Sequence, residues 1–231
     1  MTKVDDVYWK RDLILVVSQS NALWSGDPIT AWPPREREDR SSLWVNMNLA
    51  LGAWSYVRTY DVISNRGTLI HSLCARMRDR GMRPAVIHYG SGGTHSSVFY
   101  ADRATISGWM LPFAAQQVTP NIRALLWYQG ETDAQAGDGT SWQSNVAGTV
   151  AHLRTAFALP NLPLIVVKIP SNMSGAIFPY LAATRAAQDA LVAADAHAQM
   201  VECANPTYAD GVVHLDQPSL DRTANLIAPL I

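Results

Sequence analysis

Four short polar clusters carry the side chains of this chain that could do covalent chemistry. They occupy residues 18–21, 90–94, 129–133 and 210–216. Among them are a serine, a glycine pair, a glutamate and a histidine. Serine becomes a nucleophile only when a base accepts its proton, and imidazole suits that task because it titrates near neutral pH. The clusters therefore indicate a serine nucleophile with a histidine base.

The candidates for these two roles are Ser20 and His214. An imidazole acting as a base needs a carboxylate that fixes its tautomer and stabilises its charged form. Asp210 is close to His214 in sequence, and Glu131 could be close to it in space. Both carboxylates stay open as the third member of a catalytic triad, and the short spacing favours Asp210.

The same clusters contain groups that could stabilise a tetrahedral oxyanion. Gly92 and Gly93 allow the backbone to approach a ligand and to present N–H groups, and the side-chain amide of Gln129 could donate as well. Removing one such donor typically raises the barrier by about 2.7–4 kcal/mol. The expected chemistry is acyl transfer.

Continuous apolar runs are spaced along the chain as buried strands would be. They span residues 13–17, 84–89, 122–128, 164–167 and, less distinctly, 199–202. Runs without polar alternation are typical of a sheet that is covered on both faces. Three of the polar clusters directly follow such runs, which places them at the carboxyl ends of strands, where α/β sheets bind ligands.

Helical patterns alternate with these runs. They cover residues 69–77 with a stop at Gly81, 102–117 with a kink or break at Pro112, 142–157, 177–196 and a last segment from about 218. Strands alternating with helices predict right-handed crossovers and a parallel sheet. We expect a three-layer α/β/α domain with a mostly parallel, about five-stranded sheet. The charged run 35–40 is expected to be a solvated loop.

The clusters resemble the sequence blocks of the SGNH hydrolase superfamily. Within it they look most like the sialate O-acetylesterase group that includes carbohydrate esterase family 6. That group has Gly-Gln-Ser-Asn, Gly-Gly-Thr, Gln-Gly-Glu-x-Asp and Asp-x-x-His blocks in this order. Two departures stand out: Ser18 replaces the first glycine, and Asp210 and His214 are four residues apart instead of three.

The resemblance implies a role for each matching residue. It implies Ser20 as nucleophile, His214 as base, Asp210 or Glu131 as acid, and Ser20, Gly93 and Gln129 as the oxyanion hole. Further residues near the blocks are expected to contact the substrate: Asn21, Gly92, Thr94 and Trp24.

The function implied by the resemblance is removal of a small acyl group, most simply acetyl, from a carbohydrate. No cofactor is needed for this reaction, and no pair of histidines or cysteines has the spacing of a metal site. Two alternatives stay open: a lipase or thioesterase of the same superfamily, and an inactive module that binds glycans. The identity of the glycan also stays open.

Length, composition and charge bear on the number of domains, the binding partners and the location of the protein. The length of 231 residues fits one domain over 1–231, and 48% hydrophobic residues supply a sizeable core. A net charge of −1 does not favour nucleic acid or an anionic membrane as a partner. The apolar run 13–17 is too short for a signal peptide or a membrane span. We therefore expect a cytoplasmic protein, or one delivered within a larger assembly, of undetermined oligomeric state.

Overall fold

A mixed sheet forms the centre of the molecule. The computed structural model describes residues 11–23, 38–46, 55–58, 68–115, 121–137 and 139–231. In this part of the chain, seven strands pair in the order β3-β2-β4-β1-β5-β6-β7, and only the β2–β3 pair is antiparallel. The strands are β1 (Asp12–Ser18), β2 (Glu38–Asn46), β3 (Ser55–Arg58), β4 (Pro84–Gly90), β5 (Asn121–Tyr128), β6 (Leu164–Val167) and β7 (Ala198–Val201).

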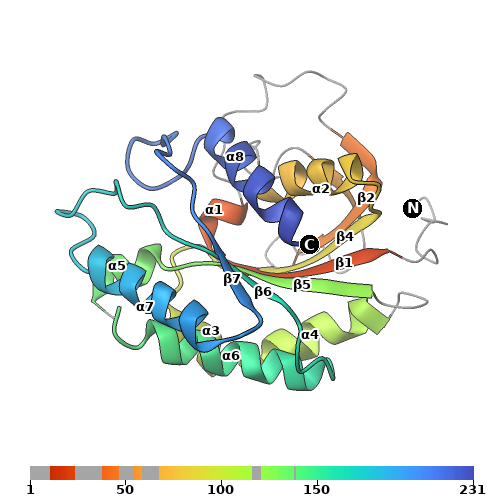
Figure 1. The fold of residues 1–231 in the computed structure, drawn as a ribbon, viewed down its shortest axis with the longest axis horizontal. Coiled ribbons are helices and arrows are strands. Elements are labelled where there is room, and N and C mark those ends of the chain that lie inside the picture. The colour runs from red at the N-terminus through yellow and green to blue at the C-terminus, as the bar shows by residue number, and fades with distance from the viewer. Residues whose placement is uncertain (1–10, 24–37, 47–54, 59–67, 116–120, 138) are drawn as a thin grey trace.

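Helices cover both faces of this sheet. Figure 1 shows α1, α2 and α8 on one side of the strands and α3 to α7 on the other. The helices are α1 (Ser20–Leu23), α2 (Leu69–Asp79), α3 (Ser96–Ala101), α4 (Arg103–Ala115), α5 (Glu131–Ala136), α6 (Trp142–Ala156), α7 (Leu181–Ala194) and α8 (Gln217–Ile227), which continues into a 3₁₀ turn (Ala228–Leu230). The predicted three-layer α/β architecture is confirmed.

Strand β1 shows why the apolar runs are continuous. Leu13, Leu15 and Val17 point into the core under α4 and α6, whereas Ile14 and Val16 point into the core under α2 and α8. All five side chains are fully buried. Because both faces of the strand are covered, no position is left for a polar residue.

The five predicted strands all form, and the structure adds two. Strands β2 and β3 extend the sheet beyond β4. The expectation of a loop over residues 35–40 was wrong for 38–40, which begin β2; residues 35–37 lie outside the described part. The first part of this strand is polar, and there Glu38 lies opposite Arg58 of β3. Its apolar residues come later, where Leu43, Trp44 and Val45 pair with β4.

Of the kink or break expected at Pro112, the break does not occur. A proline inside a helix lacks the N–H that would bond to the preceding turn, yet α4 runs through Pro112 without a break. Ile106 and Met110 before the proline and Phe113 after it are all buried in the same core. Packing on both sides of Pro112 therefore keeps the helix continuous.

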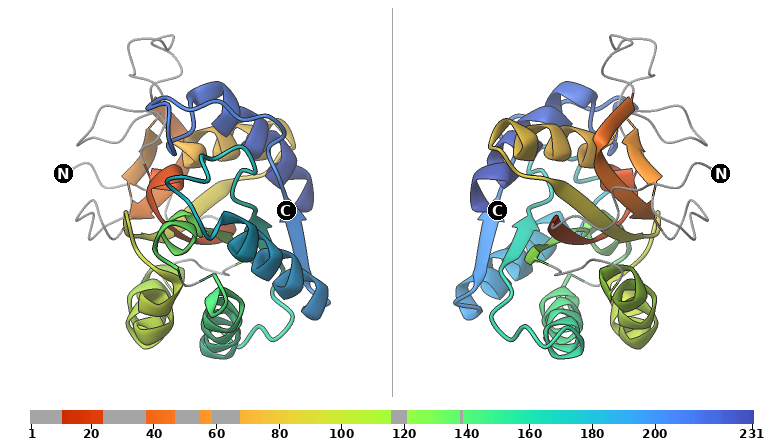
Figure 2. Two further views of the ribbon diagram at one scale, coloured as in Figure 1. Left: turned by 90° about the vertical axis from the view of Figure 1, so that its left-hand side faces the viewer. Right: turned by 90° about the vertical axis from the view of Figure 1, so that its right-hand side faces the viewer.

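The register of the central strands brings their carboxyl ends to one level. Ser18 at the end of β1 lies opposite Gly90 of β4 and Tyr128 of β5. The segments that follow these three strands therefore emerge side by side at one edge of the sheet, which faces the viewer in the left panel of Figure 2.

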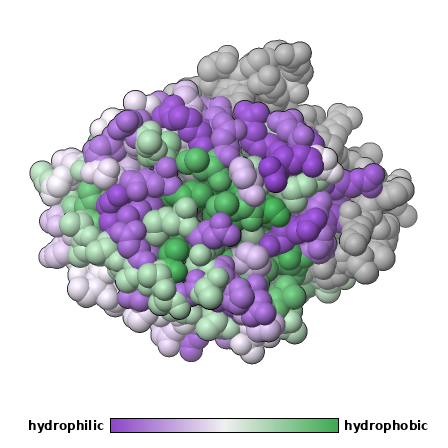
Figure 3. Space-filling model, viewed as in Figure 1, coloured by the Kyte–Doolittle hydropathy of each residue, from purple (hydrophilic) through white to green (hydrophobic). Residues whose placement is uncertain are grey.

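The face seen in Figure 3 mixes hydrophilic and hydrophobic residues, and strongly hydrophobic ones gather near its middle. Within the described residues, none of the helices has the length and apolar character to traverse a bilayer.

Candidate active site

A cleft of about 610 Å³ opens at the carboxyl edge of the sheet. Its size lies within the usual range of small-molecule sites. Segments after β1, β4 and β5 and the loops before α7 and α8 form its walls. The lining residues are Gln19, Ser20, Ser91, Gly92, Gly93, Glu131, Thr132, Gln135, Ile177, Phe178, Val212, Val213 and His214. Ser20 and His214, almost two hundred residues apart in sequence, thus line the same cleft.

Ser20 begins α1, two residues after β1 ends, and is 7% exposed. The turn before it is fixed by the N–H of Gln19, which donates to the carbonyl of Tyr128 at 3.1 Å. Ser18, which replaces the glycine of related sequences, does not crowd this turn. Its hydroxyl lies 2.6 Å from Nε2 of His88, and both side chains are fully buried.

The Ser18–His88 pair belongs to the core. Burial lowers the pKa of His88 to about 3, so this imidazole is neutral at physiological pH. A neutral ring can pair with a hydroxyl inside the sheet without burying a charge. This contact explains how serine is accommodated at position 18.

The loop before α8 presents His214 together with Asp210. Oδ2 of Asp210 lies 2.7 Å from Nδ1 of His214. Oδ1 of Asp210 accepts the N–H groups of Val212 and Val213 at 2.9 Å and of His214 at 3.1 Å. Gly211, with φ of +72°, allows the tight turn. The extra residue between Asp210 and His214 is absorbed here, and the carboxylate still reaches the imidazole.

These contacts stabilise the ionised form of Asp210. Partial burial acts to raise its pKa, but the three backbone N–H groups and the imidazole outweigh burial and lower the pKa to about 2. A carboxylate held in this way remains charged at any pH at which the imidazole could act as a base.

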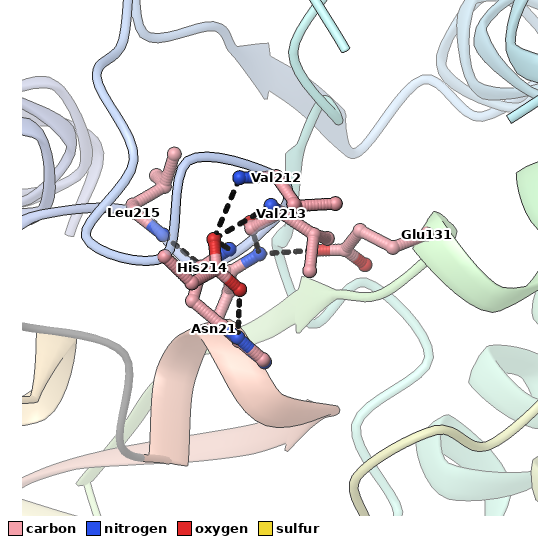
Figure 4. A network of polar contacts seen from close by, with 7 residues as sticks. Asn21, Glu131, Val212, Val213, His214 and Leu215 are labelled. Carbon is pink, nitrogen blue, oxygen red and sulfur yellow. Dashed lines mark hydrogen bonds and ion pairs between the residues drawn. The ribbon is translucent and has the colours of Figure 1, made fainter. Parts of the chain in front are cut away.

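Glu131, the other candidate acid, does not contact the imidazole. Its Oε1 accepts a hydrogen bond from Nδ2 of Asn21 at 2.6 Å (Figure 4). Its Oε2 is buried and has no hydrogen-bond partner among the described residues. Burial raises the pKa of Glu131, and the hydrogen bond from Asn21 offsets part of this effect. Of the two carboxylates, only Asp210 bonds to His214.

Asn21, which we expected to contact the substrate, lies beneath the cleft. It is fully buried. Besides Glu131, its Nδ2 donates to the carbonyl of Val213 at 3.1 Å, and its Oδ1 accepts the N–H of Leu215 at 2.9 Å. Asn21 therefore holds both sides of His214 (Figure 4).

The segment that follows β4, residues 91–94 and called the glycine segment below, lies beside Ser20. Gly92 and Gly93 both line the cleft, as expected. Gly93 has φ of +66°, which few other residues adopt at low cost. Thr94 does not line the cleft; its carbonyl accepts a hydrogen bond from Nε2 of Gln129 at 3.1 Å. The fourth expected substrate contact, Trp24, lies outside the described residues.

Gln129 is fully buried and does not line the cleft in this structure. Its Nε2 donates to Thr94 and to Asp133, and its Oε1 accepts from the indole of Trp142 at 2.8 Å. Trp donates only and a carboxylate accepts, which fixes the orientation of the amide. Both amide hydrogens are thus engaged: one holds the backbone carbonyl of Thr94 in the glycine segment, and the other bonds to Asp133.

Asp133 has a role that the sequence reasoning missed. Its fully buried carboxylate accepts the N–H of Ser96 at 3.1 and 3.2 Å, the Ser96 hydroxyl at 2.6 Å, and the Gln129 amide. It thereby caps α3 directly after the glycine segment. Burial raises the pKa of Asp133, and the Ser96 and Gln129 bonds offset part of the rise. The Asp lies in the third polar cluster, but its partner on α3 is not visible in the sequence.

An apolar wall was also missed. Ile177 and Phe178 precede α7, and Val212 and Val213 precede His214; all four line the cleft. Ile177 was expected to start a helix, but α7 begins only at Leu181, which leaves 177 and 178 in the loop. Among the described residues, no cluster of His, Cys, Asp or Glu could hold a metal ion.

A serine and an aspartate-bound histidine thus share a cleft with a glycine segment at the carboxyl edge of a parallel sheet. This fold and arrangement agree with the SGNH-type ester hydrolases that the sequence blocks resemble. The chain belongs to the carbohydrate esterase family described as sialic acid-specific acetylesterases, whose family model matches residues 10–230. Membership of this family makes the protein a carboxylic ester hydrolase of the carbohydrate acetylesterase type.

Solved structures show the same fold at low sequence identity. A protein from Arabidopsis thaliana is 20% identical with a TM-score of 0.75, over 95% of this chain and 97% of that one. NanS is 11% identical with a TM-score of 0.73, over 95% and 96%. A carbohydrate acetylesterase from Xanthomonas citri is 16% identical with a TM-score of 0.63, over 93% of this chain and 55% of that one. No curated protein matches the chain in sequence.

Proposed function

We propose that Ser20, His214 and Asp210 form a catalytic triad that removes acetyl groups from an O-acetylated carbohydrate through an acyl-enzyme. One observation carries the proposal: Ser20 and His214 line one cleft, and Asp210 binds Nδ1 of His214. With Nδ1 engaged, Nε2 is the ring nitrogen left to accept the Ser20 proton. No hydrogen bond joins Ser20 to His214 among the described residues. Such contacts are often long in unliganded enzymes and shorten when substrate binds.

The first half-reaction acylates the serine. Nε2 of His214 takes the hydroxyl proton as Oγ of Ser20 attacks the ester carbonyl carbon. The carbonyl π electrons move to oxygen and form the tetrahedral oxyanion. When the oxyanion collapses, the bond to the sugar oxygen breaks, and His214 returns the proton to that oxygen. The sugar leaves with a free hydroxyl, and Ser20 carries the acetyl group.

The second half-reaction releases the acid. His214 takes a proton from water, whose oxygen attacks the acetyl carbon. Collapse of the second tetrahedral oxyanion breaks the bond to Oγ of Ser20, and the proton returns to that oxygen. Acetate leaves and the serine is regenerated. Asp210 stays ionised throughout and stabilises the imidazolium that forms in each half.

We assign the oxyanion to the backbone N–H groups of Ser20 and Gly93, two residues that line the same cleft. Fixed donors of this kind stabilise the transition state more than the ground state. Gln129, expected as a third donor, instead supports this hole through its bond to Thr94. Its predicted direct role requires one of the two amide hydrogens to leave its present acceptor, Thr94 or Asp133.

A short acyl group on a sugar fits the composition of the cleft. Polar groups of Gln19, Thr132 and Gln135 line one part, where sugar hydroxyls could bond, and Ile177 and Val212 line another. Family membership supports a carbohydrate O-acetyl ester as the substrate class, and the Xanthomonas citri neighbour is likewise a carbohydrate acetylesterase.

The test compares Ser20→Ala with the wild type on nitrophenyl acetate, on longer nitrophenyl esters and on a panel of O-acetylated glycans, with acetate release as the readout. We expect a preference for acetyl that is lost in Ser20→Ala and kept in Ser144→Ala, whose hydroxyl lies on the exposed side of α6. A preference for long chains would indicate a lipase. Glycan binding without hydrolysis by the wild type would indicate a binding module.

A further inference from the structure

The loop that carries His214 is held by the packing of Leu215 and Val213 against apolar cores and, among the described residues, by hydrogen bonds to one side chain. Within the described part of the chain, the hydrogen bonds of residues 210–215 that leave the segment 207–216 all end on Asn21. The bonds of Asp210 are all internal to the loop. Asp210 therefore orients the imidazole within its loop but cannot set the distance from that loop to Ser20.

The position of Asn21 suits it to set that distance. Asn21 directly follows Ser20 in the first turn of α1, so the two residues move as one rigid unit. Its amide bonds to the carbonyl of Val213 and the N–H of Leu215, the two neighbours of His214. One residue next to the nucleophile thus holds the backbone on both sides of the base.

The partners of Asn21 allow only one orientation of its amide. The Leu215 N–H can only donate, so it requires Oδ1, and the Val213 carbonyl can only accept, so it requires Nδ2. The second Nδ2 hydrogen goes to Oε1 of Glu131, whose other oxygen, Oε2, has no hydrogen-bond partner among the described residues. Glu131 is 2% exposed, so this carboxylate is a fixed anchor behind the amide.

We propose that Asn21 is the positioning residue that places His214 against Ser20, and that Glu131 acts through Asn21 and not as the triad acid. This inference rests on the proposed function, because it assigns the geometry of the same triad. It gives the third polar cluster a part in catalysis without contact between Glu131 and the imidazole. A displacement of about 1 Å between reacting groups lowers rates on the order of 10²-fold.

The experiment measures kcat and KM for nitrophenyl acetate in Asn21→Ala, Asn21→Asp and Glu131→Gln. The matched control is Asn121→Ala, which removes an amide bond to Asp12 at the opposite edge of the sheet. We expect kcat to fall on the order of 10²-fold in Asn21→Ala, with KM and the shape of the pH profile kept. Asn21→Asp, which points an acceptor at Glu131 and Val213, should fall at least as far.

Glu131→Gln removes the negative charge of Glu131 but keeps an acceptor for the hydrogen bond from Asn21. A glutamine can still accept from Asn21 through its own carbonyl, so its loss of kcat should be smaller than that of either Asn21 variant. A second readout is the rate at which Ser20 displaces nitrophenolate from diethyl nitrophenyl phosphate, a reaction that also needs the base. This rate should fall in parallel with kcat.

Several results would overturn the proposal. One is a folded Asn21→Ala or Asn21→Asp whose kcat stays within threefold of Asn121→Ala. Another is a loss in Glu131→Gln as large as in Asn21→Ala, which would show that the Glu131 charge acts on His214 directly. Should Asn21→Ala fail to fold, Asn21→Asp keeps the side-chain shape and carries the test. Ser20→Ala separates the two proposals, because full activity in that variant refutes the triad itself.

Discussion

The change Asp210→Asn tests the assignment of the triad acid with almost no change in shape. Three backbone N–H groups converge on Oδ1 of Asp210. An asparagine keeps these bonds only by placing its carbonyl oxygen there, which turns its NH₂ group toward Nδ1 of His214. Nδ1 must then accept a hydrogen bond, and the ring proton moves to Nε2. His214 can no longer take the Ser20 proton.

The expected magnitude follows from this reversal of the tautomer. In serine proteases the equivalent change lowers kcat about 10⁴-fold, which corresponds to roughly 5.4 kcal/mol in the barrier. The alternative, in which the amide flips, sacrifices three backbone hydrogen bonds of about 1 kcal/mol each. The flip is therefore too costly to restore the original tautomer, and we expect kcat to fall at least 10³-fold.

The assay is steady-state hydrolysis of nitrophenyl acetate, with acetate release as a check. The control is Asp195→Asn, because Asp195 also accepts a backbone N–H, from His197, and pairs with Arg154, but follows α7 outside the cleft. A folded Asp210→Asn with activity within tenfold of the wild type would refute the assignment. It would return Glu131 to consideration as the acid.

Three further outcomes follow from buried groups around the cleft. The folded state raises the pKa of Glu131 above its ordinary value, so protonation of Glu131 stabilises the fold at low pH, and this contribution is lost as pH rises through the folded pKa. The free energy of unfolding of Glu131→Gln, measured with urea across pH 4–8, should therefore depend on pH less than that of the wild type. Asp133→Ala leaves the Ser96 N–H and the Gln129 amide without an acceptor, so we expect a loss of about 1–3 kcal/mol in urea unfolding, and unchanged stability would contradict the capping role. Gly130 has φ of +147°, and a Cβ there would lie 3.1 Å from Nε2 of Gln188, so Gly130→Ala should lower the melting temperature, with a stability loss of about 1–3 kcal/mol.

Acid should act on the stability of the Asp210 loop in the opposite sense to Glu131. The pKa of Asp210 is lowered from 3.8 to about 2 in the folded state. Its contribution is therefore present above pH 3.8 and is lost as pH falls toward 2. The difference in free energy of unfolding between the wild type and Asp210→Asn should shrink over that range, and a constant difference would contradict the hydrogen-bond network.

The sequence by itself determined the sheet core, most of the helices and the location of the chemistry. Runs such as 13–17 are apolar at every position because both faces of their strand are buried. Strand ends in a parallel sheet share one edge, so clusters after such runs must converge. The positions of Ser20 and Gly93 at the cleft followed from these local patterns, whereas His214 was predicted from its chemistry and from the resemblance of its sequence block.

Only the tertiary structure decided which groups meet within that cleft. From the sequence, both Asp210 and Glu131 were candidates for the acid of the triad. In the structure, the turn at Gly211 brings Asp210 to the imidazole of His214, whereas Glu131 accepts a hydrogen bond from Asn21. The β2–β3 extension was not predicted either, because β2 begins with the polar residues 38–42 and its apolar run is only three residues long, 43–45. Hydrogen bonds depend on the direction and separation of individual atoms, and those are fixed only when segments more than a hundred residues apart pack together.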